Sequence, residues 1–71
     1  MDFPHELQSL LLREPFDPFR IKLVNGDAHD ISYRDNVSLL TDSVFHAALD
    51  GTWVQFPYDR IVSLESLLDP P

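Results

Sequence analysis

Three histidines are the residues of this chain whose chemistry most readily suggests a reactive or metal-binding site: His5, His29 and His46. His29 lies between the carboxylates of Asp27 and Asp30, and imidazole and carboxylate groups together are common metal ligands. Asp27, however, falls in a predicted turn, and neighbouring residues of a strand point to opposite faces, so His29 and Asp30 diverge. One or two ligands are too few for a closed site, and we therefore expect no metal and no other cofactor.

A hydrolytic enzyme would need a serine nucleophile, a histidine base and an orienting acid at one place. All three residue types occur in the chain, but none of its serines lies in the glycine-flanked turn that presents such a nucleophile. A β domain of this size also encloses no pocket of useful volume. We therefore expect a protein that is not an enzyme and that works by binding.

Most aromatic rings of the chain alternate with aliphatic residues, which is typical of side chains that face the interior of a β structure. We expect core positions for Phe19, Phe45 and Phe56. Trp53 falls on the face opposite Phe56, where a large ring either forms a contact surface or is covered by the helix or the tail. The sequence leaves these two possibilities for Trp53 equally open.

Basic residues are few, and Arg20 and Lys22 share one face of a predicted strand. We expect cross-strand pairing of this face with Asp30, because a hairpin brings these residues together without help from the rest of the fold. The alternative is a small anion-binding strip that Arg34 and Arg60 would extend.

The charge balance restricts the classes of partner. The 71 residues include 12 Asp/Glu and 5 Lys/Arg, which gives a formal net charge of -7. Such a charge repels nucleic-acid phosphates and anionic lipids at long range. No apolar stretch approaches the roughly 20 residues that span a bilayer, and the first residues lack the basic region of a secretion signal. We therefore expect a cytoplasmic protein without membrane contact.

The chain is also short and contains no cysteine. We expect one small domain over residues 1–71, which buries only about 60% of the surface of the unfolded chain. Disulfides and thiolate-bound metals are excluded as sources of stability. The remaining source is association with copies of the chain itself or with a protein partner.

An apolar stripe of Leu7, Leu10 and Leu11 at helical spacing predicts a helix over about residues 4–14, ended by Pro15. From residue 19 to about residue 66 the apolar period is two, which predicts short strands. Asn25-Gly26 and Asp50-Gly51 are favourable hairpin turns with positive φ. Two prolines exclude the tail, residues 67–71, from any sheet. The expected strands cover residues 20–25, 29–32, 44–49, 52–56 and 61–65, and residues 37–40 are expected to be extended as the second half of one bent strand.

Strands this short and this few do not make a two-layer sandwich, but they can curl into a small barrel that hides most sheet edges. We therefore expect a mostly β fold. It consists of an N-terminal helix and a five-stranded, bent, SH3-like or Sm-like barrel, with the helix capping one end.

Three segments carry a resemblance to a known family: residues 23–26 (Leu-Val-Asn-Gly), 33–40 (Tyr-Arg-Asp-Asn-Val-Ser-Leu-Leu) and 58–63 (Tyr-Asp-Arg-Ile-Val-Ser). Together with the order of elements, they resemble the Sm-like family, to which the Hfq-like RNA chaperones belong. The resemblance implies a 3₁₀ turn between the last two strands. It also implies a ring in which the last strand pairs with the fourth strand of a neighbour. Residues 15–21 also look like a group of small uncharacterised bacterial proteins of this length, which has no assigned activity.

The resemblance places the uridine contacts of the family on residues of other types in this chain. The Lys-His pair of the family falls on Asp59 and Arg60, and its base-stacking phenylalanine falls on Asn36. Because an acidic side chain repels phosphate and Asn36 has no aromatic face, we expect no tight binding to U-rich RNA. The possible ligand or RNA contacts are Arg20, Lys22, Asn36, Tyr58 and Arg60.

Three functions remain, and the sequence favours the first. It is a self-assembling, non-enzymatic Sm-like binding or adaptor protein. The second is an Sm-like RNA-binding protein with altered specificity. The third is a monomeric acidic regulatory or inhibitor module whose surface mimics nucleic acid. The homo-oligomer contact of the first would include Trp53, Phe56, Tyr58, Ile61 and Ser63.

Overall fold

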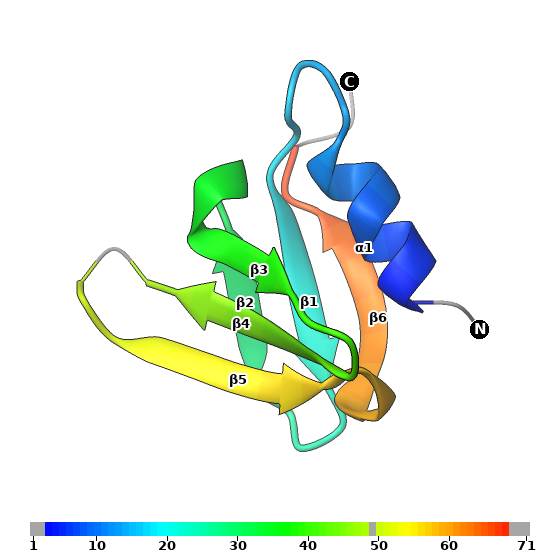
Figure 1. Ribbon diagram of the computed structural model, residues 1–71, viewed down its shortest axis with the longest axis vertical. Coiled ribbons are helices and arrows are strands. Elements are labelled where there is room, and N and C mark those ends of the chain that lie inside the picture. Colours follow the sequence, from blue (N-terminus) through cyan, green and yellow to red (C-terminus); the bar gives the residue numbers. More distant parts are fainter. Residues whose placement is uncertain (1–2, 49, 69–71) are drawn as a thin grey trace.

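The computed structural model describes residues 3–48 and 50–68 of the chain. Within this part the fold is mostly β, as the sequence predicts, and one N-terminal helix precedes two three-stranded antiparallel sheets (Figure 1). The first sheet has the strand order β2-β1-β6, and the second has the order β3-β4-β5. The elements are α1 (Phe3–Leu11), β1 (Phe19–Leu23), β2 (Ala28–Ile31), β3 (Val37–Leu39), β4 (Ser43–Ala47), β5 (Trp53–Pro57) and β6 (Ile61–Ser66), with the 3₁₀ helices η1 (Arg34–Asn36) and η2 (Tyr58–Arg60).

Helix α1 is shorter than predicted, because it ends at Leu11 and not near Glu14. The proline at position 15 keeps Glu14 out of the α conformation, and the chain has to turn toward β1 over the residues that follow the helix. Leu7 and Leu11 are buried, and Leu10 packs against the border of the core. The apolar stripe of the helix therefore lies where the sequence places it.

Positive φ was predicted for both residues of each hairpin turn. Among the described residues only the glycines adopt it, with φ of 94° for Gly26 and 95° for Gly51. The Leu23 amide donates to the Asp27 carbonyl at 2.9 Å, and the Gly26 amide donates to the Leu23 carbonyl at 3.1 Å. These bonds enclose three loop residues, a hairpin geometry in which the last loop residue has positive φ. The loop therefore begins directly after Leu23, two residues before the predicted end of the strand.

Two 3₁₀ turns carry the chain from one sheet to the other. The first turn, η1, separates β2 from β3, so the bent strand expected here is divided and the described residues form six strands and not five. The polar residues 34–36 join no ladder, and the Asn36 amide donates to the Tyr33 carbonyl at 3.2 Å. The second turn, η2, returns the chain from β5 to β6 at the place where the Sm-like resemblance implies a 3₁₀ turn.

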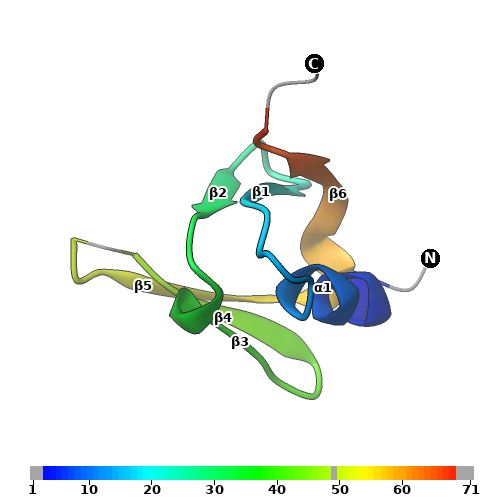
Figure 2. The same ribbon diagram turned by 90° about the horizontal axis from the view of Figure 1, so that it is seen from above.

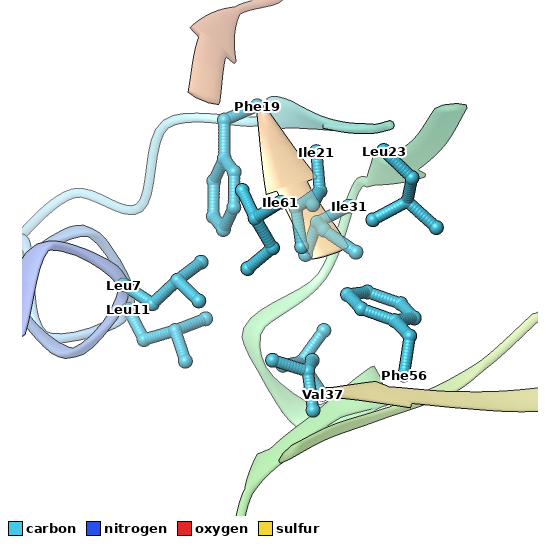
Figure 3. Close-up of a cluster of buried hydrophobic side chains, with 10 residues drawn as sticks. Leu7, Leu11, Phe19, Ile21, Leu23, Ile31, Val37, Phe56 and Ile61 are labelled. Atoms are coloured by element: carbon cyan, nitrogen blue, oxygen red, sulfur yellow. The ribbon is translucent and has the colours of Figure 1, made fainter. Parts of the chain in front are cut away.

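The hydrophobic core lies between the two sheets, and α1 lies beside β6 (Figure 2). Leucines of α1 point toward the side chains of both sheets (Figure 3). Because each layer supplies only part of the core, the layers depend on one another for stability. The core consists of Leu7, Leu11, Phe19, Ile21, Leu23, Ile31, Val37, Val44, Phe56 and Ile61.

Arg34 of η1 holds the connection between α1 and β1. Its Nη2 donates to the Arg13 carbonyl at 2.6 Å, and its Nη1 lies 2.9 Å from Oε1 of Glu14. The guanidinium also lies over the Phe16 ring, 5.7 Å from the ring centroid. These contacts fix the connection against the corner between the sheets.

Candidate interaction surfaces

Strands β5 and β6 each have only one strand partner among the described residues: β5 pairs with β4, and β6 pairs with β1. Since η2 joins them directly, two free strand edges follow each other along the chain (Figure 1). The other two edge strands, β2 and β3, are joined by the η1 corner. An edge strand presents unpaired N–H and C=O groups that can accept another strand.

The second sheet differs from the first in charge. No residue of β3, β4 or β5 is Asp, Glu, Lys or Arg, although the net charge of the chain is -7. The strands of the first sheet carry Arg20, Lys22, Asp30 and Glu65. Two acidic copies repel each other least where they meet through uncharged strands, because no like charges are then brought together.

Trp53 begins β5, and 63% of its surface is exposed, so α1 does not cover it. Its ring stacks on Phe45 of β4 with the centroids 5.4 Å apart. The faces predicted for Trp53 and Phe56 are confirmed, because Phe56 is buried. The predicted core position of Phe45 is wrong, because this half-buried ring lies against Trp53, while its neighbours Val44 and His46 are buried.

The predicted oligomer contact includes residues with very different exposure. Phe56 and Ile61 are each 6% exposed and belong to the core of the single chain, so they offer little surface of their own. Ser63 is half-buried and lies opposite Lys22. Among the predicted residues Trp53 is therefore the one with a large free surface.

Tyr58 of η2 is half-buried and is anchored at both ends. Its hydroxyl donates to the Leu40 carbonyl at 2.8 Å, and its amide donates to the Asp42 carbonyl at 3.4 Å. Burial raises the pKa of the Tyr58 phenol, and the charge of Asp42 adds to this effect. The tyrosine therefore fixes η2 against the turn between β3 and β4, and its hydroxyl proton is already used in the hydrogen bond to Leu40.

The basic residues of β1 are paired within the first sheet. Nε and Nη2 of Arg20 donate to the two carboxylate oxygens of Asp30 at 2.7 and 3.3 Å, which confirms the predicted cross-strand pair. The hydrogen bond to Arg20 holds the pKa of the Asp30 carboxyl below its usual value, and Asp30 raises the pKa of Arg20. Lys22 lies 3.4 Å from Glu65 of β6, a partner that only the tertiary structure brings close. Arg20 and Lys22 therefore form ion pairs in place of an anion-binding strip.

The remaining candidate ligand contacts lie at the two separate corners of the fold. Asn36 is half-buried in η1, whereas Arg60 is exposed in η2. The structure therefore does not bring Asn36 and Arg60 into one site within a single chain.

Two histidines meet between the sheets, an arrangement that the sequence did not indicate. His29 stacks on Phe56 with the centroids 5.2 Å apart, and its ring meets the edge of His46 at 6.0 Å. His46 is 8% exposed, and its Nδ1 has no hydrogen-bond partner among the residues that the structure describes. Burial lowers the pKa of His46, and the neighbouring His29 adds to this effect. Among residues 3–48 and 50–68, no group of three or more His, Cys, Asp or Glu side chains is placed to hold a metal ion.

Comparison with protein-family models, with curated protein sequences and with solved structures gives no match to this chain. In the described part of the chain, no helix has the length and apolar character needed to cross a membrane.

Proposed function

We propose that this protein is a non-enzymatic, Sm-like binding or adaptor protein that assembles with copies of itself through β5 and β6. One observation carries the proposal: these two strands follow each other along the chain, and each has one free edge in the described residues. Pairing of β6 from one copy with β5 of the next uses one free edge of each copy and repeats until a ring closes. In this proposal, β2 and β3 act as the two halves of the bent strand of a small barrel.

The distribution of charge supports contact through β5. Two copies that each carry a charge of -7 repel each other, and the strands of the second sheet add no charge to that repulsion. Trp53 supplies the kind of large, partly exposed ring that is enriched where proteins meet. Other protein partners would use the surface that remains outside the ring.

The RNA-binding alternative has less support. Arg20, Lys22 and Arg34 are held in ion pairs, and the acidic Asp59 lies beside Arg60 in η2. Phosphate contacts need basic side chains that are free to reach the backbone of the nucleic acid. A monomeric acidic module is the function that replaces self-assembly if the chain does not associate.

Sedimentation of the wild type and of two variants at Val62 tests self-assembly. Val62 lies in β6 and is 54% exposed, so its side chain contributes little to the core. Val62→Pro removes a backbone donor from this edge strand, whereas Val62→Ile keeps both the donor and an apolar β-branched side chain and serves as the matched control. We expect a multiple of 8.2 kDa for the wild type and for Val62→Ile at micromolar concentration, and a folded species of 8.2 kDa for Val62→Pro. A folded wild-type monomer would contradict the proposal.

A further inference from the structure

The 3₁₀ turn η2 carries two adjacent exposed residues of opposite charge, Asp59 and Arg60. Within residues 3–48 and 50–68, neither side chain has an ion pair or a hydrogen-bond partner. Each of the other Lys and Arg residues binds a carboxylate. Those pairs are Arg13 with Asp17, Arg20 with Asp30, Lys22 with Glu65 and Arg34 with Glu14.

Two hollows flank η2 on different sides. The first, of about 200 Å³, lies between the β1–β2 turn and β5, and its walls include Arg60, Phe56 and Pro57. The second, of about 340 Å³, lies between the start of α1 and the start of β6, and its walls include Asp59 and Phe3. Arg60 therefore lines the hollow on the β5 side of the turn, and Asp59 lines the hollow beside α1 and β6.

We propose, building on the self-assembly proposed above, that copies of this chain join head to tail across η2. Arg60 of one copy pairs with Asp59 of the next copy. Val62 of that next copy packs into the hollow beside Arg60. The contact therefore combines one ion pair with one apolar insertion at each junction.

The direction of strand pairing brings these groups together. Every strand pair of the described residues is antiparallel. When β6 of one copy pairs with β5 of another in the same antiparallel arrangement, the first residues of β6 lie next to the last residues of β5. Those last residues of β5 line the hollow beside Arg60. Val62 is the second residue of β6 and is 54% exposed, and Asp59 precedes that strand by two positions.

Electrostatics explains why this contact selects a second copy. A guanidinium offers a planar set of donors that matches a carboxylate. Among the described residues, Arg60 is the arginine whose donors are left without a carboxylate. The backbone of Arg60 is fixed, because its carbonyl accepts a hydrogen bond from the Val24 amide at 2.8 Å. Between two copies that each carry a charge of -7, this pair supplies local attraction at the point where the strands meet.

Charge reversal at the two positions tests the contact. Arg60→Asp and Asp59→Arg each place like charges across the junction. The double variant, and an equimolar mixture of the two single variants, restore opposite charges. In sedimentation velocity at low salt, we expect each single variant to raise the dissociation constant of the assembly about tenfold. The double variant and the mixture should return to within about twofold of the wild type.

Two control variants separate the local contact from the overall charge. Arg13→Asp changes the net charge as much as Arg60→Asp does, and Asp35→Arg changes it as much as Asp59→Arg does. Both controls lie outside the proposed contact, and both should stay within about twofold of the wild type. Circular dichroism establishes that each variant is folded.

The outcomes distinguish this contact from self-assembly as such. If the wild type assembles but the reversals behave like their controls, the head-to-tail contact is wrong while self-assembly stands. The same holds if the double variant and the mixture fail to recover. If the wild type sediments as a folded species of 8.2 kDa, both proposals are overturned.

Discussion

Replacing His46 by leucine should stabilise the protein, because this histidine carries a polar atom into the core without a partner. The side chain is 8% exposed, and within the described part of the chain its Nδ1 has no hydrogen bond. Such an atom costs about 1–3 kcal/mol, and leucine fills a similar volume without it. The loss of the edge contact with His29, 6.0 Å between centroids, offsets part of this gain. We expect His46→Leu to raise the free energy of unfolding by about 1 kcal/mol at neutral pH.

Lower pH should increase the difference in the free energy of unfolding between the wild type and His46→Leu. Burial lowers the pKa of His46 in the folded protein, whereas a histidine in an unfolded chain titrates near 6.5. As the pH falls, the unfolded chain therefore binds the proton first, and the wild type loses stability from about pH 6.5 downward. One such group changes the free energy of unfolding by at most about 1.4 kcal/mol per pH unit. The leucine variant lacks this contribution.

Urea unfolding followed by the fluorescence of Trp53 measures both effects. The two proteins are compared at one concentration between about pH 7.5 and 5.5, a range that lies above the titration of ordinary carboxylates. We expect the two stability curves to diverge as the pH falls. A less stable leucine variant at neutral pH, or two parallel curves over this range, would refute the conclusion that His46 is buried as a neutral, unpartnered ring.

Two further substitutions test the turn and the corner of the fold. Gly26→Ala should lower the free energy of unfolding by about 1 kcal/mol. The cause is backbone strain at a φ of 94°, since no described residue other than the two chain neighbours has a heavy atom within 4 Å of the added Cβ. An unchanged urea midpoint would show that the turn does not need glycine. Arg34→Lys should cost about 1–2 kcal/mol, because lysine cannot reach the Arg13 carbonyl and the Glu14 carboxylate together. Equal urea midpoints for Arg34→Lys and the wild type would contradict the role assigned to Arg34.

The elements of this fold are largely readable from the sequence, because each depends on neighbours along the chain. The stripe of α1, the glycine turns and the alternation of β5 were all predicted from local patterns. The face of β4 that points toward the core was not predicted correctly. Alternation tells which residues share a face of a strand, but it does not tell which of the two faces is covered by the rest of the fold. Hydrophobicity favoured Phe45 as the inward residue, whereas the structure turns the less apolar His46 inward and places Phe45 against Trp53.

The contacts of the candidate sites could also be predicted only where they depend on neighbours along the chain. The pairing of Arg20 with Asp30 was predicted, since one hairpin register brings the two residues opposite each other. The contact of Arg34 with Glu14 joins η1 to the connection between α1 and β1, and no local sequence pattern indicates it. Arg60 has no ion pair within residues 3–48 and 50–68, and this follows only from the three-dimensional pairing of the other Lys and Arg residues with carboxylates.

The contacts of Arg34 also bear on how the protein opens. A helix of only nine residues would ordinarily be unstable by itself. Here the Arg13 carbonyl and the Glu14 carboxylate, just beyond the helix, are bound to a guanidinium from the corner between the sheets. Release of α1 from the core therefore also loosens η1, so that both belong to one cooperative unit. Amide protons of the two elements should exchange with solvent through the same opening event, and a protease should reach the connection between α1 and β1 only when that corner opens.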